Sequence, residues 1–319
     1  MSTRKIFFVS HERSSSTGGN IALHELMKSC RVKNSMLNIL PYKFRLLRLM
    51  YFAKHCIRNK KSIYILNTIN NVDLACVAML LCKDFLIILH ETERFIGYNK
   101  IKHIILNFFG GRVVLVDGRL KERYTKAKYI GNLVPLGGFD KGEYLFDPNK
   151  LKYGVVGTID KNKRQLLAIN MYRKLRLLSP SALVIIGGSS DPEYKVSVDR
   201  ESEDLKVKFY GELPREIVHS KYDVLLATSE YESYGLAVAE AIHRGKPVIF
   251  FDRGNYPNLH LDLDNVFDFN SVSRDEIHKI IALCDSLSRS GYRSVDSCPN
   301  FSYLNKIMYE NFNITNTFQ

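Results

Sequence analysis

The chain has 319 residues, of which 45% are hydrophobic and 25% charged. These values indicate a soluble globular protein of about two domains, and no internal repeat or low-complexity segment is present. No segment reaches the roughly 18 consecutive apolar residues that a membrane span needs. Six cysteines without a C-x-x-C pair favour reduced thiols over disulfides or zinc, and the first residues read as a strand rather than a signal peptide, so a cytoplasmic location is expected.

The positive charge is concentrated in the first half of the chain. The formal net charge is +13, yet residues 1–150 hold 25 Lys and Arg against 11 Asp and Glu, a net of +14, and the remainder is close to neutral. Such asymmetry points to an anionic surface or ligand for the first half.

The chain opens with a pattern typical of a nucleotide-binding α/β unit. Residues 5–9 (K-I-F-F-V) predict a buried strand, and a polar loop ending in Gly18-Gly19 leads to a helical run over residues 21–30. A strand, a glycine-rich loop and a helix are the first parts of such a unit. No G-K-[ST] follows the glycines, so the loop is not a P-loop.

Residues 43–61 combine many cations with apolar side chains. Lysines and arginines interleave there with Phe, Leu and Met. One interpretation is a basic amphipathic helix that lies on an anionic membrane. The other is an ordinary helix with one packed and one solvated face, and the sequence favours neither. No recognised nucleic-acid-binding module is visible, so nucleic acid is not an expected partner.

Short apolar runs predict further strands, separated mostly by helical stretches. They lie at residues 36–40, 62–67, 85–90, 112–117, 132–135, 182–187, 206–210 and 223–228. Repeated strand–helix alternation predicts parallel, doubly wound sheets, which bind ligands at the carboxyl ends of their strands. His90 ends one such strand, so it is a candidate site residue or a structural cap. Gly, Asp, Pro and Asn accumulate over residues 141–151 and indicate a domain boundary.

Residues 229–251 combine a loop, a helix, a stop signal and a buried strand. Ser233 predicts the N-cap of a helix, Gly245 its C′ residue, and Val248 to Phe251 a strand covered on both faces. Glu232 precedes the helix and Glu240 lies about two turns inside it. The N–H groups of Tyr234, Gly235 and Leu236 would lie between the two carboxylates and form an anion site at the helix start.

This run resembles the signature of the retaining GT-B glycosyltransferases of family 4, the glycosyl transferases group 1. That signature has two glutamates separated by seven residues, with F-G-L or Y-G-L after the first and G-x-P-V after the second. Here Glu232, Tyr234-Gly235-Leu236, Glu240 and Gly245-Lys246-Pro247-Val248 match it. An ordinary amphipathic helix with two solvated glutamates is the weaker interpretation, because the glycines and the proline match as well.

The same resemblance extends to other positions. Gly18-Gly19 match the family's glycine pair, His90 its H-D or H-E, and V-G-T-I-x-x-x-K (156–163) its phosphate-binding segment ending in Lys163. Thr158 stands where many relatives have Arg, and Arg164 is a candidate to supply the missing cation. Asn255 and Asn258 also depart from the family's Gly and Glu.

The resemblance implies a two-domain GT-B fold with doubly wound sheets. It predicts an acceptor-side domain over residues 1–145, a nucleotide-sugar-binding domain over 151–298, and a C-terminal helix over 299–319 that crosses back to the first domain. It implies that Glu240 holds the donor ribose, that Glu232 holds donor-sugar hydroxyls, and that His90 contacts the sugar from the acceptor side. Lys163 would neutralise the diphosphate, with Gly18, Gly19 and the amides of residues 233–236 (Ser233, Tyr234, Gly235 and Leu236).

The implied activity is transfer of a sugar from a nucleotide sugar, with retention and without a metal, to a lipid-linked or cell-surface polysaccharide acceptor. Two alternatives stay open. One is a sugar-nucleotide epimerase of the same fold, and the other is a non-catalytic partner subunit, which the departures at Thr158 and Asn258 motivate. Fixed donors in a closed cleft stabilise a departing phosphate, so no metal cofactor is expected.

Overall fold

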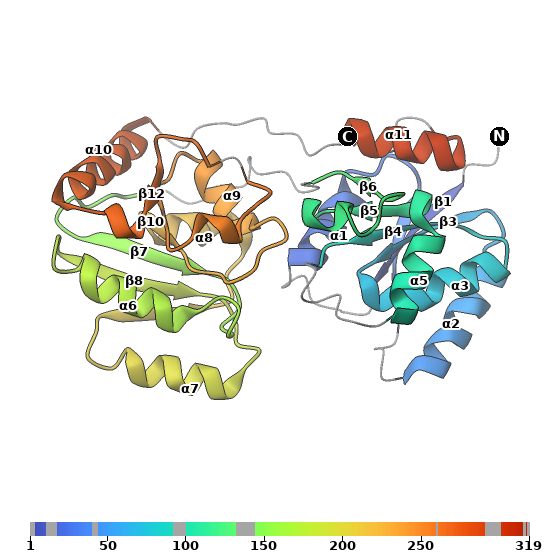
Figure 1. The fold of residues 1–319 in the computed structure, drawn as a ribbon, viewed down its shortest axis with the longest axis horizontal. Helices are drawn as coiled ribbons and strands as arrows, with labels where there is room; N and C mark the ends of the chain where they lie inside the picture. Colours follow the sequence, from blue (N-terminus) through green and yellow to red (C-terminus); the bar gives the residue numbers. More distant parts are fainter. Residues whose placement is uncertain are drawn as a thin grey trace. The chain divides into compact units, whose positions relative to one another are not determined.

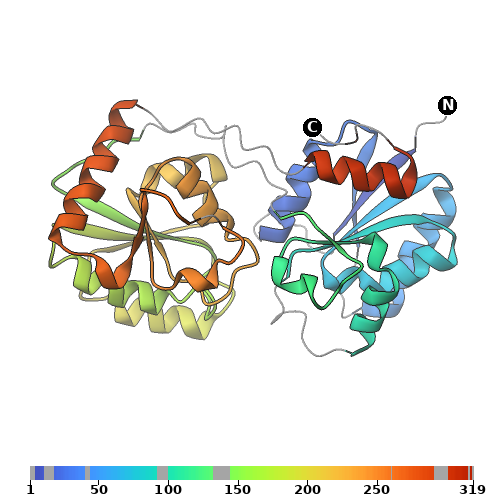
Figure 2. The same ribbon diagram turned by 45° about the horizontal axis from the view of Figure 1, so that its top comes forward.

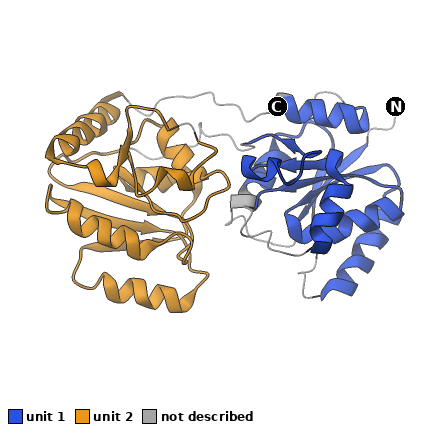
Figure 3. Ribbon diagram, viewed as in Figure 1, with its two compact units in different colours: residues 1–135, 298–319 blue, residues 136–297 orange. Residues whose placement is uncertain are grey.

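The computed structural model describes residues 4–10, 18–39, 44–91, 100–131, 144–259, 261–290, 301–314 and 317. Its contacts divide the chain into two compact units, coloured separately in Figure 3. Unit 1 comprises residues 1–135 and 298–319, and unit 2 comprises residues 136–297. The predicted strand at 132–135 and part of the predicted boundary segment at 141–151 lie outside the described residues.

Unit 1 is built on a parallel six-stranded sheet in the order β2-β1-β3-β4-β5-β6. The first five strands each overlap a predicted run, with ends that differ by at most two residues. The two-residue strand β6 was not predicted. The strands are β1 (Lys5–Ser10), β2 (Asn34–Asn38), β3 (Ser62–Asn67), β4 (Asp84–Leu89), β5 (Val113–Leu115) and β6 (Lys128–Tyr129).

Helices cover both faces of this sheet (Figures 1 and 2). Side chains of β1, β3 and β4 alternate between the two faces, and Phe7, Tyr64 and Ile87 join the core that includes helices α2, α3 and α5. Helix α1 contacts β1, β2 and β3. The helices are α1 (Gly18–Lys28), α2 (Arg45–Arg58), α3 (Val72–Leu80), α5 (Lys100–Phe108) and α11 (Phe301–Phe312), with the 3₁₀ turns η2 (Ile69–Asn71), η3 (Gly110–Arg112) and η4 (Gly118–Lys121).

The C-terminal helix α11 belongs to unit 1, although unit 2 separates it in sequence from the rest of that unit. Its apolar side chains Leu304, Ile307 and Met308 are fully buried. Glu310 of the helix pairs with Lys128, and the carbonyl of Phe312 accepts a hydrogen bond from Arg4. The helix is therefore part of the unit 1 fold.

Unit 2 repeats the plan, with a parallel sheet in the order β12-β11-β10-β7-β8-β9. Its strands are β7 (Leu151–Val156), β8 (Ser181–Ile186), β9 (Val207–Gly211), β10 (Val224–Ala227), β11 (Val248–Phe250) and β12 (Val266–Asp268). Its helices are α6 (Gln165–Leu175), α7 (Pro192–Glu201), α8 (Arg215–Val218), α9 (Leu236–His243) and α10 (Arg274–Ser290), with η5 (His219–Lys221), η6 (Arg253–Asn255) and η7 (Phe269–Ser271).

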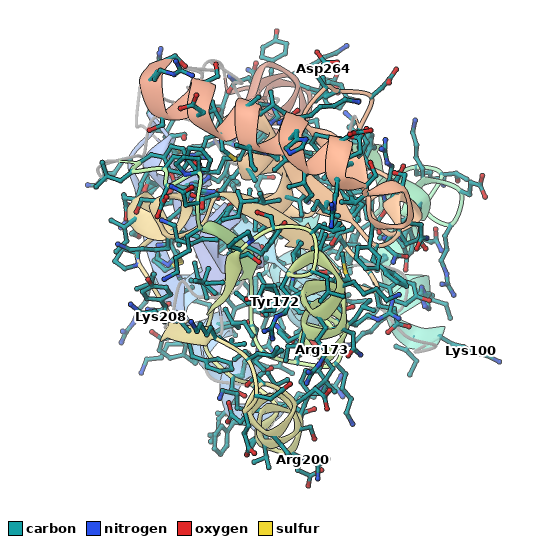
Figure 4. All side chains as sticks on the ribbon, turned by 90° about the vertical axis from the view of Figure 1, so that its left-hand side faces the viewer. Lys100, Tyr172, Arg173, Arg200, Lys208 and Asp264 are labelled. Carbon is teal, nitrogen blue, oxygen red and sulfur yellow. The ribbon has the colours of Figure 1, made fainter. Side chains whose placement is uncertain are left out.

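Each face of the unit 2 sheet has its own core. Helices α6, α7 and α10 pack on one face, and α8 and α9 on the other. Helix α6 has one buried and one exposed face, and Figure 4 labels a residue of each. Tyr172 is buried, whereas Arg173 lies at the surface and pairs with Asp204. The two units thus have the doubly wound sheets that strand–helix alternation predicts.

Among the described residues, no helix is long and apolar enough to cross a membrane. Five of the six cysteines lie in described segments, and all five are free thiols.

Candidate active site

The loops at the carboxyl edge of the unit 2 sheet are joined into one structure. The loop after β7 meets the loop after β10 through Asn162, whose carbonyl accepts a hydrogen bond from Glu230 N at 2.8 Å and whose Oδ1 accepts one from Tyr231 N at 3.1 Å. The loop after β11 joins them, because Asn255 Nδ2 donates to Ser229 O at 3.1 Å. The backbone around the predicted site is therefore fixed by contacts between three loops.

Two glycines make the close approach of these loops possible. Gly157 and Gly187 have φ values of +142° and +147°, which L side chains rarely adopt. A Cβ on Gly187 would lie 2.0 Å from the carbonyl oxygen of Gly157. A Cβ on Gly157 would lie 3.0 Å from Lys163 Cε, so the missing side chain lets the stem of Lys163 cross the end of β7.

Lys163 and Glu232 meet in this region and form an ion pair between Nζ and Oε1. Their side chains are 25% and 14% exposed, so both still reach solvent. Together with Gly235, Val238 and Tyr256 they line one small cavity of unit 2, whose walls also include residues 225–229 of β10 and its loop. The structure thus brings together one cation and one carboxylate that the sequence analysis assigned to the same site.

The N-terminus of α9 also faces this cavity, but the helix begins later than predicted. It starts at Leu236, with Gly235 as the N-cap at φ 78°, so the prediction of Ser233 as N-cap is wrong. A Cβ on Gly235 would lie 2.8 Å from the ring of Tyr256, and Asn258 Nδ2 holds the carbonyl of Ser233. The turn Ser233–Gly235 is shaped by these contacts rather than by a serine cap.

The end of α9 agrees with the prediction. Gly245 is the C′ residue at φ 78°, and Lys246 N donates to Ala241 O at 3.0 Å while Gly245 N donates to Ile242 O at 2.9 Å. This is the Schellman pattern that favours glycine.

Glu240 is the fifth residue of α9, about one turn inside the helix, and its carboxylate is buried between two partners. Arg215 of α8 pairs with Oε1, and His219 Nε2 lies 2.9 Å from Oε2. Because a carboxylate only accepts, His219 donates through Nε2, and its Nδ1 accepts from Tyr222 Oη at 2.6 Å. The sequence analysis did not find Arg215, His219 or Tyr222, since they follow β9 and carry no motif.

The ionisation of this cluster follows from its burial. Burial lowers the pKa of His219, so its imidazole is neutral near pH 7. Burial alone would raise the pKa of Glu240, but the hydrogen bond from His219 and the charges of Arg215 and Arg244 outweigh burial and lower that pKa. Glu240 is therefore an anion held in place, with a structural role that the sequence did not predict.

The structure shows the contacts of the residues that depart from the family pattern and of Arg164, the candidate replacement cation. Thr158 accepts a hydrogen bond through its carbonyl from Gln165 Nε2 at 3.0 Å. Arg164 has a left-handed backbone at φ 54°, and its guanidinium lies 5.6 Å from the ring centre of Phe251, after β11. Asn255 and Asn258 hold the carbonyls of Ser229 and Ser233. The two asparagines thus support the loop that carries Glu232.

Unit 1 contains the other predicted site residues. Gly18 and Gly19 form the first turn of α1, so this helix begins three residues earlier than predicted. His90 follows β4, at the carboxyl edge of its sheet, and its Nε2 is buried without a hydrogen-bond partner in the described part of the chain. Burial lowers the pKa of His90 to about 4, so the ring is neutral and available as a donor or acceptor.

One D-x-D triplet, Asp262-Leu263-Asp264, could offer two carboxylates to a cation. It lies just before β12, at the opposite edge of the parallel sheet from Lys163 and Glu232, and Asp264 is exposed at the surface in Figure 4. Within the described ranges, no cluster of three His, Cys, Asp or Glu side chains is arranged to hold a metal ion.

Comparison with known proteins agrees with this geometry. Residues 139–286, which cover almost all of unit 2, match the family described as glycosyl transferases group 1. The matched segment contains Lys163, Glu232 and Glu240.

The similar proteins extend the comparison to both units. An uncharacterised 41.2 kDa protein from the cps region of Klebsiella pneumoniae is 29% identical over 196 residues, which are 57% of this chain and about half (51%) of that protein. Anabaena HepE in complex with UDP-glucose is 16% identical, with a TM-score of 0.65 over 97% of this chain and 95% of that one. The lipopolysaccharide outer core galactosyltransferase WaaB is 16% identical, with a TM-score of 0.60 over 96% of this chain and 99% of that one. These structures show that the fold is GT-B.

Proposed function

We propose that the chain is a retaining glycosyltransferase of family 4 that takes a sugar from a nucleotide-sugar donor without a metal ion. The observation that carries the proposal is the meeting of Lys163 and Glu232 in one cavity at the N-terminus of α9. A cation and a helix N-terminus suit a diphosphate, and an adjacent carboxylate suits sugar hydroxyls. Anabaena HepE, which has the same fold, was solved with UDP-glucose, and this supports a nucleotide sugar as the donor.

In this proposal each donor group has a partner in unit 2. Lys163, the amides at the start of α9 and Arg164 neutralise the diphosphate. Glu232 accepts hydrogen bonds from sugar hydroxyls, and Glu240 accepts them from the ribose while Arg215 and His219 hold its carboxylate. His90 in unit 1 acts on the acceptor side, where its Nε2, which has no hydrogen-bond partner among the described residues, supplies one hydrogen bond.

The reaction follows from these roles. As the anomeric C–O bond to the diphosphate breaks, negative charge grows on the departing phosphate, and fixed positive groups stabilise it. The acceptor hydroxyl attacks the same face of the sugar, and its proton passes to the departing phosphate oxygen. Retention then needs no enzymatic nucleophile.

The acceptor that we propose is a glycan of the cell surface, either lipid-linked or polymeric. WaaB is a lipopolysaccharide outer core galactosyltransferase, and the Klebsiella relative is encoded in a cps region. Both names support this class of acceptor for the present chain.

The first experiment is a thermal-shift panel of UDP, GDP, ADP and CMP together with their sugar conjugates. A nucleotide that binds only the folded state, at about 100 times its Kd, should stabilise it by about 2.7 kcal/mol. The stabilising nucleotide sugar is then incubated with and without glycan acceptors. Conversion without an acceptor would identify an epimerase, and binding with no turnover in any mixture would identify a non-catalytic subunit.

We also propose that unit 1 binds the cytoplasmic face of an anionic membrane through helix α2. This helix packs through a narrow stripe of Arg48, Phe52 and Cys56. Its other faces expose apolar side chains, of which Leu46 is 71%, Met50 60% and Ile57 61% exposed. Helix α5, which lies with α2 against α3, exposes further large apolar side chains (Ile101, Ile104 and Phe108).

The cations of α2 do not all face solvent, as the amphipathic interpretation had assumed. Arg48 is fully buried and pairs with Asp73 Oδ1 at 3.3 Å, whereas Arg45, Lys54 and Arg58 are exposed. Exposed apolar side chains beside exposed cations are the combination that favours an anionic interface. The membrane-binding surface therefore consists of the exposed side chains of α2 and α5, without Arg48.

We expect the protein to cosediment with vesicles containing anionic lipid and not with zwitterionic vesicles. Each exposed cation contributes about 1 kcal/mol, so replacing Arg45, Lys54 and Arg58 with Gln should weaken binding about a hundredfold. The matched control replaces three exposed cations of unit 2 with Gln (Arg200, Lys206 and Lys208) and should leave binding unchanged. Equal losses in both triple variants would show a non-specific charge effect instead.

A further inference from the structure

The ion pair between Lys163 and Glu232 joins two residues that are proposed for different parts of the donor. Lys163 is assigned to the diphosphate and Glu232 to the sugar, yet the two side chains bind each other. Both side chains line the same cavity and are partly exposed. The carboxylate of Glu232 therefore takes the place at Lys163 Nζ that an anionic ligand would need.

The backbone on both sides of this pair is fixed. Lys163 N donates to Asp160 Oδ1 at 2.8 Å, and the carbonyl of Lys163 accepts from Thr228 Oγ1 at 2.8 Å. Glu232 N donates to Asn255 O at 3.3 Å. Because these hydrogen bonds tie both main chains to neighbouring loops, rotation of the two side chains is enough to open the pair.

We propose, on the basis of the donor site described above, that this pair makes the cavity discriminate between a nucleotide sugar and the nucleoside diphosphate that remains after transfer. A nucleotide sugar replaces both halves of the pair, because its phosphate binds Lys163 and its hydroxyls bind Glu232. A nucleoside diphosphate draws Lys163 away but offers the Glu232 carboxylate no hydroxyl in exchange.

The consequence is a difference in affinity that favours turnover. Both ligands break the ion pair, but the donor gives Glu232 sugar hydroxyls in exchange for Lys163, whereas the spent nucleotide gives it none. When the sugar leaves, Glu232 competes with the phosphate for Lys163 and assists product release. Glu232 is thus a residue that determines specificity for donor over product.

The test uses Glu232→Gln, which keeps the shape of the side chain and removes its charge. The probes are inorganic pyrophosphate, UDP and UDP-glucose, and their Kd values are measured by calorimetry at one salt concentration. We expect the variant to bind pyrophosphate and UDP about tenfold more tightly than the wild type, while UDP-glucose gains no affinity. Unchanged pyrophosphate binding, or equal tightening of all three probes, would overturn the inference.

Two further variants separate the pair from a general charge effect. Glu230→Gln makes the same charge change two residues away and should leave all Kd values unchanged. In a Lys163→Met background, Glu232→Gln should no longer tighten pyrophosphate, since the competition passes through Lys163. Undiminished tightening in that background would assign the effect to simple repulsion and contradict the proposal.

The inference and the proposed function can fail separately. In one outcome, Glu232→Gln tightens pyrophosphate binding as expected, but no nucleotide sugar in the panel binds or turns over. The ion pair then competes with anions, and the proposed nucleotide-sugar donor is wrong. In the other outcome, a nucleotide sugar turns over but Glu232→Gln leaves the affinity for pyrophosphate unchanged. The proposed function is then supported, and the proposed discrimination between donor and product is wrong.

Discussion

Lys163→Ala is expected to lower kcat/KM for sugar transfer by about 10²- to 10³-fold, the usual cost of losing one fixed group that stabilises transition-state charge. Charge on the departing phosphate is larger in the transition state than in the bound donor, so kcat should fall more than KM rises. The variant also leaves the Glu232 carboxylate beside the phosphate without its cation. Steady-state kinetics with the donor identified in the nucleotide panel provide the measurement.

The matched control for this variant is Lys161→Ala. Lys161 lies in the same loop, two residues earlier, and is exposed. It should change kcat/KM less than about twofold, because an exposed cation away from the cavity is screened by solvent. A loss in Lys163→Ala that is confined to KM would show that Lys163 binds the ground state only.

Much of the fold could be predicted because the strands are buried on both faces. β3 (Ser62–Asn67) is buried throughout, and such a strand reads as a continuous apolar run with clear ends. Of the three strands that were not predicted, β6 and β12 have only two and three residues, too few for any periodicity. The third, β7 (Leu151–Val156), carries Lys152 and Gly154, which interrupt its apolar run. Helix α9 was predicted to start at Ser233 because serine is a good N-cap, but Gly235 takes that place since contacts with Tyr256 and Asn258 shape the turn.

The site was predictable where its residues belong to the family's sequence motifs. Lys163 and Glu232 were both assigned to the donor, and the structure brings them into one cavity. That they would pair with each other did not follow from the motif, because pairing depends on how the loops after β7 and β10 are joined by Asn162. The sequence had the same limit for Arg48 in unit 1, because its spacing on α2 resembles that of the exposed cations. Hydrogen bonds to Asn70 O and Asn71 Oδ1, with the nearby charge of Asp73, hold its guanidinium inside.

Glu240 is the clearest case of a site residue with a second role. The motif alone suggests a carboxylate that faces a ribose and has no structural partner, so its removal would leave the fold intact. The structure contradicts this, because both oxygens are already bound by Arg215 and His219 and the side chain is 6% exposed. Removing one member of a buried charge pair strands the other and costs about 3–5 kcal/mol.

We therefore expect Glu240→Ala to lower the free energy of unfolding by about 3–5 kcal/mol, measured by urea denaturation, with Arg215 left partly buried without its anion. Glu216→Ala, which removes a glutamate from the neighbouring helix α8, serves as the control and should cost less than about 1 kcal/mol. An unfolding free energy of Glu240→Ala equal to that of the wild type would show that the cluster is not needed for stability.

To test whether Glu240 binds the ribose of the donor, a variant must fold, and one ligand must contain a ribose while the other lacks it. Glu240→Gln keeps the shape of the side chain and still accepts one hydrogen bond, so it should be more stable than Glu240→Ala. It should bind UDP at least tenfold more weakly than the wild type, because a hydrogen bond to a charged group contributes about 1.5–3 kcal/mol. Pyrophosphate has no ribose, and its Kd should change less than twofold. If the Kd values of UDP and pyrophosphate rise equally, the substitution has changed the shape of the cavity. Glu240 would then be a structural residue only.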